Sequence, residues 1–322
     1  MPCSEYTPAT AVGTRSKCAR QPLRFETPTS AHIAAVRQVL DQYTLTRTCD
    51  FSVGGIFMWA DWFGYSLCMP GDETLLIGGR AEGVPGDVKA FSLPVCRDIP
   101  AAVHAIIGHC RRYRIRPVFS AVPEDFVAAV MRGAGMRGDV TELTDWADYL
   151  YDIDDIAYLR GKRFNKKRNH VNRFVADNPH YSVEPIDNSL IPETLLFCAG
   201  RRHDHDGSKM AVYEHGQCMR VLNEWPAFGF DGLVLRAESG EIAAFSAAEV
   251  IGDTAFVHIE KCNHEIAGAN EAMASFMAKY LANKYSRLRY LNREEDVGDD
   301  GLRLAKQSWQ PVQMLRKYNI FF

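Results

Sequence analysis

The order of strand-like and helix-like segments in the second half of the chain restricts the fold more than any other feature of the sequence. Strand segments show apolar residues at period two, whereas Met273, Met277 and Leu281 recur at helical spacing. In chain order we predict a strand at 181–186, helices at 191–203 and 213–224, and three strands at 233–237, 242–250 and 254–261. A helix at 269–285 and a strand at 288–291 follow. The chain then forms a short helix, capped by Asp299 or Asp300 and with Leu302 and Ala305 facing inward, and a strand at 312–315. This alternation predicts an α/β protein with a mixed sheet.

The first half of the chain gives weaker signals. We predict a helix after Ser30, strands near 64–69, 74–78, 117–120 and 147–151, and a helix near 99–112. The long apolar stretch at 53–69 carries Asp61 and three glycines, which favours buried strands over a membrane helix. This half could be a degenerate copy of the unit in the second half.

Composition excludes several classes of protein. The chain has 37 basic and 40 acidic residues, so its net charge of −3 offers no overall attraction for nucleic acid or anionic lipid. The nine cysteines never form a C-x-x-C pair, which predicts reduced thiols and neither a disulfide framework nor a metal cluster. Residues 1–20 lack the apolar stretch of a signal peptide and are predicted to be a disordered tail. We expect a cytoplasmic protein without a transmembrane segment.

Charge reverses abruptly in the middle of the chain. Residues 139–155 contain seven acids and no base, and residues 160–173 contain seven bases and no acid. We therefore place a boundary near 150–158, between a first unit at 21–155 and a second unit at 156–322.

The basic segment forms an amphipathic helix when it is plotted at 100° per residue. Phe164, Val171 and Val175 lie on one side, and a stripe of basic and amide side chains lies on the other. Such a stripe suits phosphate groups, although the acids before it could also neutralise it. No aromatic side chain lies among the bases on their side of the helix, so sequence-specific DNA or RNA recognition is not implied. The predicted phosphate-binding residues of this basic helix are Lys162, Lys166, Lys167, Arg168, Asn169 and Arg173.

A second charged segment follows the predicted strand at 288–291. The acids Glu294, Glu295 and Asp296 are predicted to bind a substrate ammonium group, although an exposed loop with incidental charge would look the same. Arg303 and Lys306 lie one helical turn apart just beyond this acidic turn (residues 292–299). They would counter negative charge on a bound substrate or on an intermediate.

The strand at 254–261 should lie beside the strand at 288–291. Period two puts His258 and Glu260 on one face, which makes both candidates for proton transfer, with Asn292 or a backbone N–H stabilising an oxyanion. A lone histidine in a strand is more often a structural residue, so both interpretations remain open.

Three blocks of sequence together resemble a known family. They are the stretch from Leu159 to Phe174, the stretch His258-Ile259-Glu260-Lys261, and Asn292-Arg293-Glu294-Glu295-Asp296-x-Gly298 followed by Gly301-Leu302-Arg303-x-Ala305-Lys306. Over about residues 24–318 the chain resembles a bacterial family related to the C-terminal domain of phosphatidylglycerol lysyltransferase. The resemblance implies two GNAT-like units in tandem, as in Fem-type aminoacyltransferases, which transfer an aminoacyl group from a charged tRNA to a lipid hydroxyl or a peptidoglycan amine.

The element order of the second half is also that of GNAT-type acyltransferases, but one motif departs from their acetyl-CoA branch. Where that branch has Q/R-x-x-G-x-G/A, this chain has His264-Glu265-Ile266-Ala267-Gly268-Ala269, which weakens acyl-CoA as the donor. The sequence thus predicts an acyl- or aminoacyltransferase whose donor is an aminoacyl-tRNA or an acyl-CoA. Its partners would be tRNA or a phosphate-bearing small molecule, with peripheral contact to phospholipid. The alternative is a catalytically inactive GNAT-like module that binds a phosphate-bearing ligand.

Overall fold

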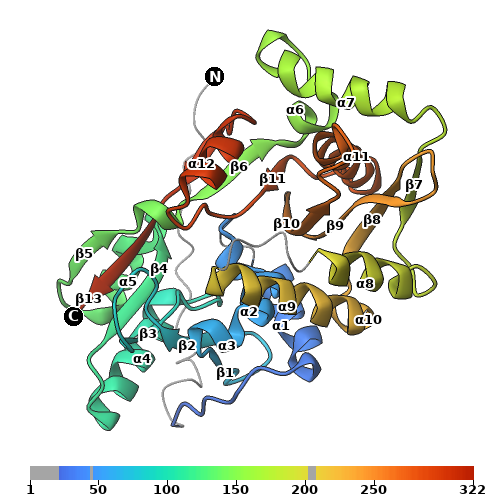
Figure 1. The fold of residues 1–322 in the computed structure, drawn as a ribbon. Coiled ribbons are helices and arrows are strands. Elements are labelled where there is room, and N and C mark those ends of the chain that lie inside the picture. The colour runs from blue at the N-terminus through green and yellow to red at the C-terminus, as the bar shows by residue number, and fades with distance from the viewer. Residues whose placement is uncertain (1–21, 44–45, 202–207) are drawn as a thin grey trace.

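The computed structural model describes residues 22–43, 46–201 and 208–322, so the predicted tail at 1–20 lies outside the described residues (Figure 1). The chain forms two mixed sheets with helices packed against them, which confirms the predicted α/β class. The first sheet has the strand order β1 (Ser66–Cys68), β2 (Leu76–Arg80), β3 (Lys89–Phe91), β4 (Val118–Pro123), β13 (Lys317–Phe321), β5 (Asp139–Glu142). Only β3 and β4 pair in parallel within it.

The second sheet contains the strands predicted for the second half of the chain. Its order is β12 (Gln313–Leu315), β6 (Asp148–Asp152), β11 (Tyr290–Asn292), β10 (Thr254–Cys262), β9 (Ile242–Ile251), β8 (Asp231–Arg236), β7 (Ser182–Pro185). As predicted, β10 and β11 are adjacent, and they pair in parallel with Thr254 opposite Tyr290. All other pairs in this sheet are antiparallel.

Two strands cross the boundary that the charge reversal predicts near residue 156. β6 precedes that boundary but belongs to the second sheet, and β13 lies near the end of the sequence but is inserted between β4 and β5 of the first sheet. The sheets are therefore tied together by exchanged strands. The predicted division at 156 does not coincide with the division between the sheets.

Helices cover both faces of the second sheet (Figure 1). On one face α6 (Ile153–Tyr158), α7 (Asn165–Asp177) and α11 (Ala269–Lys284) pack together over Phe164, Phe174 and Met273. On the other face, a larger apolar core includes Val36, Phe57 and Phe245 and extends under the first sheet. The helices are α1 (Ile33–Gln42), α2 (Val53–Met58), α3 (Ala60–Phe63), α4 (Ile99–Tyr113), α5 (Val127–Ala134), α6 (Ile153–Tyr158), α7 (Asn165–Asp177), α8 (Ile191–Gly200), α9 (Lys209–Asn223), α10 (Trp225–Phe228), α11 (Ala269–Lys284) and α12 (Asp300–Gln307).

The apolar stretch at 53–69 is the clearest departure from the predicted elements. We expected buried strands, but α2 and α3 occupy most of it and only β1 is a strand. The Ser52 hydroxyl caps α2 by accepting a hydrogen bond from Gly55 N–H at 2.9 Å, and Gly64 ends α3 in the left-handed conformation with φ 60°. All six residues of α2 are buried, so the segment shows no amphipathic pattern.

Two further findings concern the described residues as a whole. No helix within them combines the length and apolar character that crossing a bilayer requires. Seven cysteines fall within them, and these are all buried and form no disulfide with one another.

Candidate functional site

A cavity of about 620 Å³ opens beside the carboxyl end of β11, between the two halves of the chain. Most of the residues that line it come from α3, α7, α9, β10, α11, the acidic turn and α12. Its aromatic lining consists of Trp59, Phe63, Trp146 and Trp309. Its charged lining consists of Lys167, Glu214, Glu260, Lys261, Glu271, Arg293, Glu294, Glu295, Asp299 and Lys306. We call this space the junction cavity.

Three ion pairs fix much of this charged lining. Lys261 Nζ lies 2.7 Å from Glu214, and Arg293 lies 2.6 Å from Glu260. Lys167 Nζ lies 3.4 Å from Glu271 and 4.4 Å from the centre of the Trp309 ring. Burial lowers the pKa of Lys167 below its usual range. The cavity therefore presents both signs of charge on side chains that are held in place.

Lys306 is held in this lining by hydrogen bonds to the backbone. Its ammonium group donates to the backbone carbonyls of Arg293 and of Glu295, the latter at 2.6 Å. Burial lowers the pKa of Lys306, although the carboxylates of Glu294 and Glu295 act in the opposite direction. An ammonium group has three N–H donors, so one donor remains for a ligand in the cavity.

A β-bulge separates the two residues that we expected on one face of β10. The register with β9 shifts between Val257 and Ile259, so His258 is the extra residue and the alternation changes there. The His258 ring lies near the rings of Phe230 and Phe256, outside the cavity lining, whereas Glu260 lines the cavity. The predicted shared face is therefore wrong, and only Glu260 can reach a substrate. Burial raises the pKa of Glu260.

His258 bridges two carboxylates inside the protein. Its Nε2 lies 2.8 Å from Glu249 Oε1, and its Nδ1 lies 2.7 Å from Glu294 Oε1. The side chains of His258 and Glu249 are completely buried, whereas the Glu294 side chain is 22% exposed and lines the cavity. Glu294 thus lines the cavity while buried His258 holds its carboxylate in place.

The geometry does not support the oxyanion role expected for Asn292. The residue is fully buried, and its amide donates to Arg47 O and to Asp148 Oδ2, both at 2.7 Å. Its side-chain oxygen accepts a hydrogen bond from Glu294 N–H at 2.6 Å. Asn292 does not line the cavity, and it fixes the start of the acidic turn, where Glu294 has φ 58°.

Asp296 and Arg303, both predicted to contact substrate, pair with each other instead. The two Asp296 oxygens lie 2.9 and 3.0 Å from Arg303 nitrogens, and Tyr149 OH donates to Asp296 Oδ2 at 2.6 Å. Arg303 also pairs with Asp145 at 2.8 Å. Neither lines the cavity, so they hold the acidic turn against α12 and β6. Leu302 and Ala305 of α12 line the cavity rather than a core.

Glu295 joins a second buried network, which the sequence did not reveal. Its carboxylate accepts a hydrogen bond from the Cys49 thiol at 3.0 Å and lies 3.8 Å from Lys317 Nζ. Lys317 is completely buried and lies 2.8 Å from Asp50 Oδ2 and 2.6 Å from Asp148 Oδ1. Burial raises the pKa of Asp50 to about 6.

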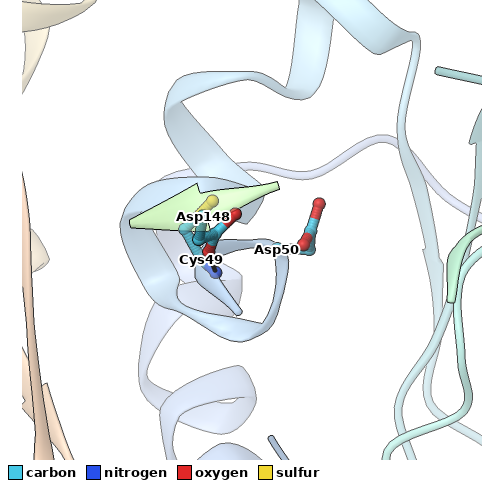
Figure 2. Close-up of side chains that lie close together, drawn as sticks. All are labelled: Cys49, Asp50 and Asp148. Atoms are coloured by element: carbon cyan, nitrogen blue, oxygen red, sulfur yellow. Dashed lines mark hydrogen bonds between the residues drawn. The ribbon is translucent and has the colours of Figure 1, made fainter. Parts of the chain in front are cut away.

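Cys49, Asp50 and Asp148 have the chemistry and proximity of a metal-ligand set (Figure 2). One potential ligand atom from each lies within 4.8 Å of the other two. The Lys317 ammonium, however, already lies within 3.7 Å of all three groups. It supplies the positive charge that a metal ion would supply, so this cluster does not fit a metal site.

The basic helix contributes a single residue to the junction cavity. Lys167 lines it, while Lys162, Lys166, Asn169 and Arg173 are exposed on the outer face of the segment 162–173, as the helical plot predicts. Arg168 is partly buried and donates to the carbonyls of Leu159 and Gly161. The predicted phosphate residues therefore divide into one cavity residue, one structural residue and an exposed stripe.

A second cavity of about 520 Å³ adjoins the first. Both are lined by Phe63, Trp146 and Met210, and the second continues along the loop at 81–87. Its remaining lining includes Trp62 and Arg80. The two cavities together offer room for more than one ligand.

Several residues of the site gave no usable signal in the sequence. Glu249, Asp50 and Lys317 lie outside the three blocks of family resemblance and reach the site only through the fold. The one available hint was that Glu249 and Lys317 are charged residues in largely apolar strands, and such residues are rarely buried without a partner.

Comparisons with known proteins agree with this architecture. The sequence profile described as "Phosphatidylglycerol lysyltransferase, C-terminal" matches residues 41–321. A search of curated proteins gave no match. A conserved protein of unknown function from Bacteroides thetaiotaomicron VPI-5482 is similar in structure, with a TM-score of 0.83, 29% identity and coverage of 93% of this chain and 99% of that chain.

Two solved structures with lower identity share the fold. L-PGS from Bacillus licheniformis has a TM-score of 0.65 and 14% identity, with 92% of each chain covered. FemX has a TM-score of 0.55 and 11% identity, with 93% of this chain and 98% of that chain covered. These likenesses agree with two GNAT-like units in tandem. Because the family profile spans most of the sequence, the chain belongs to the family of phosphatidylglycerol lysyltransferase C-terminal domains.

Proposed function

We propose that this protein is an aminoacyltransferase whose reaction takes place in the junction cavity. The observation that carries the proposal is Lys306, a partly buried ammonium that two backbone carbonyls hold in the same cavity lining as Glu294, whose carboxylate interacts with it electrostatically. An aminoacyl ester carries an ammonium group next to a carbonyl group. A site for such a group needs an anion and a hydrogen-bond donor close together, which these two residues supply.

The reaction would use Glu294, Lys306 and Glu260 in distinct roles. Glu294 would bind the α-ammonium group, and the remaining N–H donor of Lys306 would stabilise the oxyanion that forms when the acceptor attacks the ester carbonyl. Glu260 would take the proton from the attacking hydroxyl or amine and pass it to the departing ribose oxygen. Its raised pKa makes it a stronger base than an ordinary carboxylate.

The exposed stripe of the basic helix would bind the phosphates of a tRNA donor. Lys162, Lys166 and Arg173 point away from the core, and Lys167 of the same helix reaches the cavity. A donor lying along this helix could therefore place its acylated end beside Lys306. Hydrogen bonds and charge pairing with phosphates would supply affinity without reading sequence.

Acyl-CoA remains the weaker donor, because residues 264–269 depart from the pyrophosphate-binding motif of the acetyl-CoA branch. The glycine that this chain keeps in that segment, Gly268, has a structural reason of its own. It has φ 79°, and a Cβ there would lie 2.2 Å from His170 O, so the glycine is needed for the packing of α11 against α7. The acceptor would enter through the second cavity, and the family description makes phosphatidylglycerol the first acceptor to test.

The test is a transfer assay with the whole chain. The protein is incubated with radiolabelled aminoacyl-tRNAs, one amino acid at a time, and with acetyl-CoA, each with vesicles containing phosphatidylglycerol or with free amines. We expect deacylation of an aminoacyl-tRNA and the appearance of label in the acceptor. Binding of tRNA without any turnover would contradict the proposal and would favour the inactive binding module.

A further inference from the structure

A continuous chain of alternating charges runs from the surface of α1 to the junction cavity. Arg37 on α1 lies 3.1 Å from Glu249 Oε2, and Arg37 also donates to Phe228 O. Glu249 Oε1 accepts hydrogen bonds from Gly54 N–H at 2.7 Å and from His258 at 2.8 Å. His258 then reaches Glu294 at 2.7 Å. The mechanism proposed above uses only the last member of this chain.

The geometry specifies the protonation state of His258. Each ring nitrogen faces a carboxylate oxygen, which can only accept a hydrogen bond, so both nitrogens must carry a proton. Burial alone would lower the pKa of His258, but the hydrogen bonds and charges of Glu249 and Glu294 raise it to about 9. The ring is therefore an imidazolium at neutral pH.

His258 has no access to the cavity, so it cannot contact a substrate. Its side chain is completely buried, and the rings of Phe230 and Phe256 and the backbone of Gly54 lie close to it. Its hydrogen bond to Glu294 is the only one to that carboxylate from the described part of the chain. Without this bond, the Glu294 side chain would be free to adopt other rotamers at the cavity surface.

We propose that His258 is a positioning residue, which, held by Glu249, fixes the Glu294 carboxylate at the point where the α-ammonium group of the aminoacyl donor binds. This inference rests on the proposed function, and it assigns roles to His258 and Glu249, neither of which touches the donor. It also explains why Gly54 is required, since a Cβ at that position would lie 2.3 Å from the His258 ring.

The charged members of this chain besides His258 are Arg37 on α1, Glu249 on β9 and Glu294 on the acidic turn. One further charged group, Asp41 on α1, faces the chain. Asp41 interacts electrostatically with both Arg37 and Glu249, and burial raises its pKa. Replacing Glu249 by Gln removes the negative charge closest to Nε2, so His258 should lose its second proton at a lower pH.

The first experiment needs no substrate. The ring nitrogens of ¹⁵N-histidine-labelled protein are observed by NMR, and His258 is identified by its contacts with the rings of Phe230 and Phe256. We expect both nitrogens to be protonated at pH 7.5 and to titrate near pH 9. A neutral His258 ring at pH 7.5 would overturn the proposal, whether or not the protein transfers an aminoacyl group.

The second experiment measures transfer with the aminoacyl-tRNA that the assay identifies. We expect Glu249→Gln to raise the KM for the donor about tenfold and to change kcat less than twofold, because binding rather than chemistry is affected. The alkaline rise in KM should begin at lower pH than in the wild type. The donor amine titrates in both proteins, so the difference between the two profiles is the readout.

The matched control is Glu241→Gln, an exposed acid just before β9, which should leave KM and its pH profile unchanged. If Glu249→Gln does not fold, Arg37→Met removes the positive charge that shares Glu249 with His258, so the pKa of His258 should rise and the alkaline rise in KM should begin at higher pH than in the wild type. A folded Glu249→Gln with a wild-type KM and profile would overturn the positioning role while leaving the proposed function intact. Failure of the wild type to use any donor would instead contradict the function.

Discussion

Lys317 Nζ lies 2.6 Å from Asp148 Oδ1, and both side chains are completely buried. Lys317 belongs to β13 of the first sheet and Asp148 to β6 of the second, so this ion pair connects the two sheets at the point where they exchange strands. Asp148 also accepts hydrogen bonds from Asn292 and Cys49 N–H. The pair therefore supports the acidic turn as well as the join between the sheets.

Replacing Lys317 by Met should lower the free energy of unfolding by about 3–5 kcal/mol at pH 8, because it leaves buried carboxylates without their cation. Urea denaturation measures the loss. The loss should be smaller at pH 5, since burial raises the pKa of Asp50 to about 6 and protonation removes its charge. Arg316→Met, which removes an exposed partner of Glu124 and Glu142, should cost at most about 1 kcal/mol. Equal losses for the two variants would contradict this account.

The stability of the protein should fall in alkaline solution because of His258. Its pKa is about 9 in the folded protein against about 6.5 when unfolded, so its contribution is complete below about pH 6.5 and is lost as pH rises through 9. The difference corresponds to about 3 kcal/mol. Urea unfolding at pH 6.5 and 9.5 should show a larger alkaline loss for the wild type than for His258→Gln. Parallel losses would show that His258 is not an imidazolium in the folded state.

Replacing Lys306 by Met should lower kcat by about 10²–10³, the usual effect of removing one oxyanion donor. It should also cost about 1–3 kcal/mol of stability, because two backbone carbonyls lose their donor. Tyr151→Phe is the matched control, since Tyr151 OH donates to Lys306 O at 2.8 Å and does not line the cavity. That variant should lose about 1 kcal/mol and keep its turnover. A comparable loss of turnover in both variants would make Lys306 structural.

Gly54→Ala should both destabilise the protein and raise the KM for the donor. The new methyl group would lie 2.3 Å from His258 Cδ2, so the ring must move away from Glu249 or Glu294. We expect a loss of about 1–3 kcal/mol, as for overpacking in a core. Gly216→Ala, in the open interior of α9, should instead stabilise by about 0.5–1 kcal/mol. Thermal unfolding and donor kinetics of the two variants measure the contrast.

Binding of tRNA should weaken steeply with salt if the exposed stripe of the basic helix contacts phosphates. The slope of log K against log salt should lose about one unit for each phosphate contact removed by Lys162→Gln or Lys166→Gln. Arg168→Gln should instead act mainly on stability, since its guanidinium holds the Leu159 and Gly161 carbonyls. Slopes that do not change in the lysine variants would place the tRNA elsewhere.

The elements of the second sheet could be predicted because each one carries its own local signal. The meander at 231–262 has turn residues between alternating strands, and α12 begins at the predicted cap Asp299. α2 was missed since every residue in it is buried, which removes the periodicity that marks a helix. The only local indications of helix in this stretch were Ser52, which caps α2, and Gly64, which ends α3.

The site could be predicted only in part for a different physical reason. The acidic turn and Lys306 lie close together in the sequence, so their proximity was foreseeable, and both do line the cavity. The His258 bulge adds one residue to β10 and reverses the faces after it, which no pattern in a single strand reveals. Lys317 meets Asp50 and Asp148 only because β13 crosses into the other sheet.

The insertion of β13 between β4 and β5 has a consequence for synthesis of the protein on the ribosome. The first sheet lacks an interior strand until residue 321 has emerged, so the edges of β4 and β5 that pair with β13 stay unpaired until then. Most multidomain chains fold their early segments first. Here the first sheet cannot be completed until β13 has been synthesised. The nascent chain should therefore depend on chaperones more than the size of its sheets suggests.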